Sequence, residues 1–445
     1  MGRLATWWEA VRDSLWFLPA VFTAAAGGLA FTTIRIDRTL LADAQLQAPY
    51  LLGVGAEGAR GILDAVSSSI ITVTGVVFSI TIVALQLASN QFTPRLLRNF
   101  TADRANQVVL GIFIGTFTYA LLVEGTIRSG PEREFVPTIS VAIAVGLALV
   151  SIGALIFYIN HASRIIQASV IIDRVTHDTL RVVDKLFPEE FGRPLRSAAA
   201  AALPAGPPVQ ISAETGGFLQ AVDEESIFEE AARGGYTVRM DIRIGDFVLP
   251  GATLATAWPR DRIDEELKRS IESAFVLGPE RTPHQDVDFG VLELMDIAVK
   301  ALSPSVNDPT TAIHCVDRLG ELLVHLGRRN EPVRERTDSR GRVRFISRPA
   351  SFERTVSLAF DQIRHFGADN PAVVRRLIQM LGQVAVLTPA ARHGPLEHQA
   401  AELLAAAGRA LKDHDALADL RRLAAPLLAG ADPARHGPGS GAEAA

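Results

Sequence analysis

The densest group of side chains that could do chemistry lies between residues 286 and 314. It contains carboxylates, one amide and one imidazole, and we call it the polar cluster: Asp286, Asp288, Asp296, Asn307, Asp308 and His314. Carboxylates beside a turn can bind a hard cation. Their spacing here does not follow a calcium-binding loop, and one histidine does not define a transition-metal site. We therefore treat the polar cluster as a candidate binding site, and we predict no metal and no cofactor.

The same segment also predicts a corner between two helices. Residues 291–301 and 313–326 carry apolar side chains at helical spacing, and Ser303-Pro304 interrupts them. Asp308 can cap the second helix, and Pro309 suits its first position. In this alternative the polar side chains only end one helix and begin the next.

Motifs and composition narrow the function classes. The chain has no glycine-rich phosphate loop, no HExxH and no GxSxG, so we predict that it is not an enzyme. Its formal net charge of −5 gives no reason to expect a nucleic acid partner. Cys315 is the one cysteine, which excludes an internal disulfide and a multi-cysteine metal site. An enzyme working through the polar cluster is the least favoured hypothesis.

Four apolar stretches dominate the first third of the chain. A helix needs about 20 mainly apolar residues to cross about 30 Å of hydrocarbon. The stretches that meet this requirement are residues 14–34, 65–88, 108–123 and 136–160. We therefore predict an integral membrane domain that crosses the bilayer four times. The expected partner of this domain is the lipid bilayer.

Arginines beside these stretches indicate the orientation. With the N-terminus inside, seven arginines flank the inner ends of the spans and five flank the outer ends. Because positive residues favour the cytoplasmic side, this bias favours a cytoplasmic N-terminus. An even number of spans then places the C-terminus on the same side. We expect a multi-pass protein of the bacterial inner membrane, with both termini cytoplasmic.

The second span is unusually polar. Thr72, Gly75, Ser79 and Gln86 recur at spacings of three, four and seven residues, so they can share one helix face, and Asn90 follows near the helix exit. Hydroxyls and small residues in a membrane often serve only helix packing. They can also line a polar pathway. Both interpretations stay open, and the second makes these five residues candidate pathway-lining residues.

The remainder predicts a soluble α+β region. Short strands and glycines between Val209 and Trp258, including Gly245-Asp246-Phe247-Val248, resemble the small barrel-sandwich module of biotinyl and lipoyl domains. A carrier role is excluded because no lysine lies between Lys185 and Lys268. We expect a four-span transmembrane domain (1–161), a helical connector and linker (162–207), a small β-barrel-like module (208–260), a mainly helical soluble domain (261–430) and a disordered tail (431–445).

Two blocks of sequence carry a resemblance to a known family. One is Val76-Val77-Phe78-Ser79-Ile80-Thr81-Ile82-Val83-Ala84-Leu85-Gln86 continuing to Arg95. The other runs from Asp286 to Asp317 and is centred on Phe289-Gly290 and on Ala301-Leu302-Ser303-Pro304-Ser305-Val306-Asn307-Asp308-Pro309-Thr310-Thr311-Ala312. In these blocks the chain resembles DUF2254, a family of bacterial predicted membrane proteins. The resemblance implies four N-terminal spans and a soluble remainder. It implies no activity and no catalytic residue.

Two hypotheses on function follow. The first is a channel or transport-like protein, formed by a homo-oligomer because four spans leave little room inside one chain, with the second span lining the pathway. The second is a membrane-anchored cytoplasmic sensor or scaffold whose soluble region binds a ligand or partner. The first rests on the polar second span, and the second on a large soluble region without catalytic motifs. The sequence does not identify the transported solute in the first hypothesis or the ligand in the second.

Overall fold

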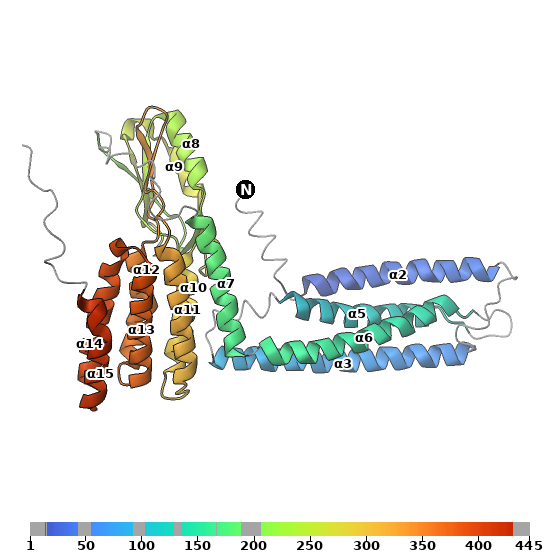
Figure 1. Cartoon of the computed structure of the whole chain (residues 1–445). Coiled ribbons are helices and arrows are strands. Elements are labelled where there is room, and N and C mark those ends of the chain that lie inside the picture. Colours follow the sequence, from blue (N-terminus) through green and yellow to red (C-terminus); the bar gives the residue numbers. More distant parts are fainter. Residues whose placement is uncertain are drawn as a thin grey trace, which may run out of the picture. The chain divides into compact units, whose positions relative to one another are not determined.

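The computed structural model divides into two compact units, with the boundary between Gln167 and Ala168 (Figure 1). The structure describes residues 14, 16–42, 55–91, 103–128, 135–165, 167–187 and 206–429. The expected tail (431–445), most of the expected linker and the side chain of Asn90 lie outside the described residues. We call the two parts the N-terminal unit and the C-terminal unit and describe each by itself.

The N-terminal unit is a bundle of apolar helices. Its members are α2 (Phe17–Ala42), α3 (Ala56–Gln91), α5 (Arg104–Glu124) and α6 (Thr138–Ile165). Each of these helices is long and apolar enough to cross a membrane. This confirms the expectation of four apolar helices at the start of the chain. Helix α5 packs against the other three, and 61% of its apolar window is buried, against 22–28% in the others, so it forms the centre of the bundle.

Buried hydroxyls join the helices of this bundle at three levels. Thr33 meets Tyr119 at 2.9 Å, Thr116 meets Ser151 at 3.1 Å, and Thr81 meets Tyr158 at 2.6 Å between their side-chain oxygens. Such pairs between membrane helices contribute about 0.6 kcal/mol each on average. Their main effect is to hold the helices in one register.

A buried carboxylate fastens α2 to the start of α6. Asp37 is 3% exposed, and it accepts hydrogen bonds from the backbone amides of Ile139 and Ser140, both at 3.0 Å, and from the Ser140 hydroxyl at 2.6 Å. These are among the amides at a helix start that have no partner within the helix. The carboxylate therefore caps α6 and ties two distant segments together.

The C-terminal unit begins with helix α7 (Ala168–Leu186) and continues into an α/β module. The strands and helices of that module are β1 (Val209–Ser212), β2 (Gly217–Val222), α8 (Glu224–Gly234), β3 (Thr237–Met240), β4 (Phe247–Val248), β5 (Thr253–Trp258), η2 (Arg260–Arg262), α9 (Glu265–Ser273), β6 (Phe275–Gly278), β7 (Glu335–Thr337) and β8 (Val343–Ile346). They form one sheet of order β1-β5-β3-β8-β7 and one of order β4-β2-β6. Apolar side chains from both sheets share one core. A closed barrel is not shown by these described strands.

The β7–β8 hairpin joins its sheet from far along the chain. Strand β8 pairs with β3 in parallel, with Val238 opposite Phe345. The Thr237 hydroxyl adds a 2.6 Å hydrogen bond to the Val343 carbonyl. The sheet of the module therefore includes strands that lie outside the expected range of 208–260.

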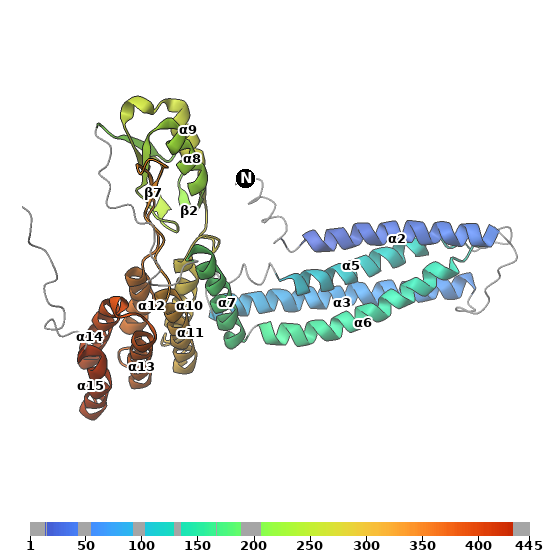
Figure 2. The same ribbon diagram turned by 45° about the horizontal axis from the view of Figure 1, so that its top comes forward.

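The remaining helices lie beside one another at one end of the α/β module (Figure 2). They are α10 (Val287–Ala301), α11 (Pro309–Gly327), α12 (Phe352–Gly367), α13 (Pro371–Leu387), η3 (Ala390–Arg392), α14 (His393–Ala410) and α15 (His414–Leu428). Helix α7 packs on α10 and α11. The mixed α/β region and the C-terminal helices agree with the expected α+β class.

Candidate functional site

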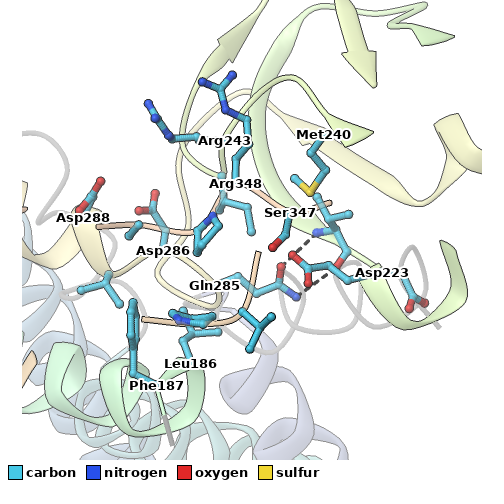
Figure 3. Close-up of a pocket in the computed structure, with 18 of the residues that line it drawn as sticks. Leu186, Phe187, Asp223, Met240, Arg243, Gln285, Asp286, Asp288, Ser347 and Arg348 are labelled. Atoms are coloured by element: carbon cyan, nitrogen blue, oxygen red, sulfur yellow. Dashed lines mark hydrogen bonds between the residues drawn. The ribbon is translucent and has the colours of Figure 1, made fainter. Parts of the chain in front are cut away.

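A cavity of about 440 Å³ opens where the α/β module meets the ends of α7 and α10 (Figure 3). We call it the junction pocket. Its apolar wall includes Leu186, Phe187, Met240, Ile244 and Val287. Two members of the polar cluster, Asp286 and Asp288, lie on its other side.

Asp286 is a buried helix cap. Its side chain is 3% exposed and accepts the backbone amide of Phe289 at 3.1 Å. The same carboxylate receives Nε and Nη2 of Arg281 at 2.9 and 2.6 Å. Burial raises the pKa of Asp286 to about 6, and the charge of Arg281 offsets part of that rise. Its acceptor atoms are therefore already engaged within the protein.

Asp288 is engaged as well. It accepts Nε of Arg354 and the hydroxyl of Thr355, both at 3.1 Å. Both partners belong to α12, so this carboxylate joins the first turns of α10 and α12. The two carboxylates of the polar cluster that reach the pocket thus hold its wall together.

Arg243 is a half-buried basic side chain in the lining of the pocket. Among the described residues, no carboxylate pairs with its guanidinium. Burial lowers the pKa of Arg243, and the nearby charges of Arg348 and Arg354 lower it further, while the charges of Asp246 and Asp288 offset part of this shift. Arg348 donates to the Asp241 carbonyl, and its side chain lies with Arg243 on one edge of the pocket (Figure 3). This edge therefore carries concentrated positive charge.

Gln285 fixes the floor of the pocket. Its side-chain oxygen accepts the Val222 amide at 3.0 Å, and its side-chain nitrogen donates to the Val222 carbonyl at 3.4 Å (Figure 3). This double contact joins the strand end of β2 to the start of α10. The floor is thereby set by the protein's own hydrogen bonds.

The rest of the polar cluster lies elsewhere. Asp308 caps α11 through the Thr311 amide at 3.1 Å, and hydrogen bonds from Thr311 lower its pKa. Asn307 occupies the turn before it with φ of 47°. His314 lies 3.7 Å from Asp173 of α7. These residues follow α10, whose 15 residues span about 22 Å, so they do not converge with Asp286.

Asp296 lies along α10 and is not among the residues that line the pocket. Across the described ranges, no group of three or more histidine, cysteine, aspartate or glutamate side chains is placed to hold a metal ion. The polar cluster of the sequence is therefore dispersed in space: Asp286 and Asp288 lie in the pocket wall, Asn307 and Asp308 form a capped corner, and Asp296 and His314 lie at neither place.

The candidate pathway residues share one exposed face of α3. Thr72, Gly75, Ser79 and Gln86 are all exposed. The Thr72 hydroxyl donates to the Ser68 carbonyl at 2.7 Å, and a Cβ added at Gly75 would meet nothing within 4 Å. In one chain this stripe faces away from the bundle and is open to lipid or to another protein.

Comparisons with known proteins agree with this architecture. The family model described as "Predicted membrane protein (DUF2254)" matches residues 12–383. Uncharacterized proteins of Mycobacterium bovis and Mycobacterium tuberculosis are each 36% identical to the chain over 390 residues, covering 84% of it and 72% of their own length. No solved structure matches. The chain therefore belongs to DUF2254, a family of predicted membrane proteins of unknown function.

Proposed function

We propose that the protein is a membrane-anchored sensor whose C-terminal unit binds a small carboxylate with an apolar body in the junction pocket. The unpaired guanidinium of Arg243 carries this proposal. Asp286 and Asp288 form their ion pairs with Arg281 and Arg354. Neither forms one with Arg243, although the charges of Asp246 and Asp288 offset part of its positive charge. A charged side chain that is partly buried without a partner costs free energy unless a ligand compensates it.

The remaining wall supports an amphipathic ligand. Pockets for small molecules usually measure about 300–1,000 Å³ and are mainly apolar, with a few polar groups that fix orientation. The volume of about 440 Å³ and the wall of Leu186, Phe187 and Met240 fit that description. The planar guanidinium of arginine matches a carboxylate with two parallel hydrogen bonds. We place this unit in the cytoplasm and the spans in the inner membrane, as the arginine bias favours.

The test compares octanoate with octylammonium, which has the same number of carbon atoms and the opposite charge. Full-length protein in nanodiscs should bind octanoate saturably and octylammonium at least tenfold more weakly. Arg243→Ala should weaken octanoate binding at least tenfold in calorimetric titrations. Arg422→Ala is the matched control, because Arg422 is 80% exposed on α15. Equal binding of the two probes, or equal binding by both variants, would contradict the proposal.

A second candidate is a channel formed between copies of the chain. One observation favours it: the stripe of Thr72, Gly75, Ser79 and Gln86 faces outward, where a pore between subunits would lie. Inside a single bundle that position is taken by packed side chains such as Tyr119 and Phe113. A homo-oligomer is therefore part of this proposal.

A larger side chain on the exposed polar stripe of α3 tests the channel hypothesis. Ser79→Leu should abolish ion or solute flux into liposomes while the protein still reconstitutes. Ser69→Leu adds the same bulk at another exposed position of α3, roughly 80° around the helix from Ser79, and should keep the flux. A monomer in detergent together with no flux in the wild type would overturn this candidate.

A further inference from the structure

A second pocket, of about 720 Å³, lies at the α/β module and shares no lining residue with the junction pocket. Three segments far apart in the sequence form it: the end of α8, the short helix η2 and the turn between β7 and β8. Each contributes arginine, and the four are Arg233, Arg262, Arg340 and Arg342. We call this site the arginine pocket.

Among the described residues, Asp338 is the one carboxylate that lines the arginine pocket, and its oxygens already accept several hydrogen bonds. Asp338 accepts the backbone amides of Arg340 and Arg342 at 2.9 and 3.0 Å. It also accepts Nε of Arg342 at 3.2 Å and Nε of Arg344 at 2.9 Å. Although burial alone would raise its pKa, these hydrogen bonds hold the pKa of Asp338 below its ordinary range. The Asp338 carboxylate is therefore charged at neutral pH and forms ion pairs with Arg342 and Arg344.

Three arginines remain without a carboxylate. Among the described residues, Arg233, Arg262 and Arg340 form no ion pair with an acidic side chain. Four arginines and one aspartate give the lining a formal charge of +3, on a chain whose net charge is −5. Such a local excess of positive charge attracts anions to a concave surface.

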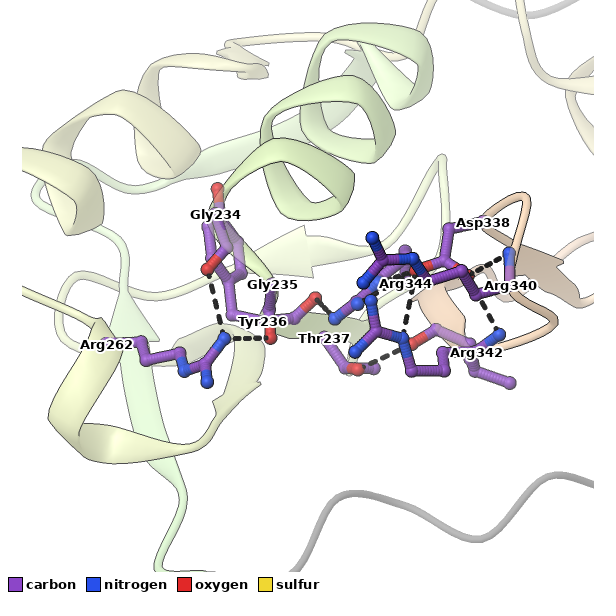
Figure 4. A network of polar contacts seen from close by, with 10 residues as sticks. Gly234, Gly235, Tyr236, Thr237, Arg262, Asp338, Arg340, Arg342 and Arg344 are labelled. Carbon is purple, nitrogen blue, oxygen red and sulfur yellow. Dashed lines mark hydrogen bonds and ion pairs between the residues drawn. The ribbon is translucent and has the colours of Figure 1, made fainter.

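Backbone carbonyls hold one of these arginines, Arg262, in place (Figure 4). Nη1 of Arg262 donates to the carbonyls of Gly235 at 3.1 Å and Gly234 at 3.5 Å. A Cβ at Gly235 would lie 2.2 Å from that nitrogen, and its φ of +72° also favours glycine. Arg340 lies in the turn that Asp338 and Gly341, with φ of +75°, set. Preorganised donors lose less entropy when a ligand binds.

We propose that the arginine pocket binds a phosphate group. A phosphate offers several anionic oxygens to guanidinium groups arranged around it, and the Thr337 and Ser339 side chains on the same lining can donate further hydrogen bonds. The proposal does not rest on the junction pocket or its ligand. The phosphate can come from a soluble molecule or from a lipid headgroup, and the experiment separates the two.

Full-length protein in nanodiscs of zwitterionic lipid is titrated with pyrophosphate and, separately, with dihexanoyl phosphatidic acid. Saturable binding of either probe, weakened at least tenfold by Arg340→Ala and by Arg262→Ala, is the expected result. Tighter binding of pyrophosphate indicates a soluble source, and tighter binding of the lipid indicates a headgroup. Because the contact is between exposed charges, affinity should fall as salt rises.

Two variants serve as controls. Arg422→Ala removes an exposed arginine elsewhere, and Arg243→Ala disables the junction pocket alone. Both should keep wild-type affinity for the phosphate probes. Failure of both probes to bind, equal binding by Arg340→Ala and Arg422→Ala, or loss of binding in Arg243→Ala would each overturn the proposal.

Discussion

Replacing Asp286 with alanine is expected to destabilise the C-terminal unit by about 3 to 5 kcal/mol. The Arg281 side chain is 13% exposed, and removal of its partner leaves a buried charge uncompensated, which typically costs that much. The first turn of α10 also loses the cap on the Phe289 amide. Denaturant unfolding of full-length protein in detergent, followed by a probe in the C-terminal unit, measures the change.

An exposed cap is the control for this result. Asp413 caps α15 through the amides of Asp415 and Ala416, both at 3.0 Å, and no arginine in the described part of the chain forms an ion pair with it. Asp413→Ala should cost about 1 kcal/mol, the usual price of a lost N-cap. Equal losses for the two variants would show that Asp286 acts only as a cap.

The same comparison has a defined pH dependence. Folding raises the pKa of Asp286 to about 6, whereas an unfolded aspartate titrates near about 3.9. Between these values the folded protein binds the proton more tightly, so stability from this group rises as pH falls from about 6 toward about 4. The gap between wild type and Asp286→Ala should therefore be wider at low pH, by at most about 3 kcal/mol from about two pKa units. A gap that narrows on acidification would contradict this account.

The apolar helices could be predicted because their signal is local. A run of apolar side chains longer than a soluble core helix allows marks a span without knowledge of its neighbours. The helices extend beyond those runs: α3 covers Ala56–Gln91, although its apolar run begins only at Ala65. Polar residues such as Asp64 continue the helix, because hydrophobicity identifies the apolar part and backbone hydrogen bonding sets the ends.

The junction pocket could be predicted only in part, because its partners are distant in the chain. Asp286 and Asp288 stand out by composition, but Arg243 comes from the loop after β3 and Arg354 from α12. Spacing along the chain carries no information about such contacts. The same limit hid the arginine pocket, since β8 pairs with β3 although the two strands are far apart in the chain.

Asp308 shows why one motif supports two interpretations. The Asp-Pro pair predicts a helix start, and the Thr311 amide confirms it. A carboxylate used as a cap is indistinguishable in sequence from one placed to bind a ligand. The structure distinguishes these two roles by position: Asp286 lies beside a cavity, whereas Asp308 is not among the residues that line it.

Replacing Gly290 with alanine is expected to destabilise the C-terminal unit by about 3 kcal/mol. A Cβ at this position would lie 1.8 Å from Oγ1 and 2.9 Å from Cβ of Thr179. Thr179 is 4% exposed and donates to the Val175 carbonyl at 2.7 Å, so it has no room to turn away. Overpacking a tight contact costs about 1 to 3 kcal/mol, sometimes more, and here it would push α7 from α10. Chemical denaturation and the octanoate affinity of the junction pocket, whose wall includes Leu186 at the end of α7, are the two measurements.

A double variant and a second glycine make this prediction specific. Thr179→Ala removes Oγ1 and the Cγ2 methyl, so the double variant should recover about 1 kcal/mol or more relative to the sum of the two single losses. Gly382 lies inside α13, where an added Cβ meets nothing within 4 Å. Gly382→Ala should therefore stabilise the unit by up to about 1 kcal/mol through helix propensity. Strict additivity of the first pair would place the cost of Gly290→Ala elsewhere than at Thr179, because two groups that collide in one contact cannot act independently.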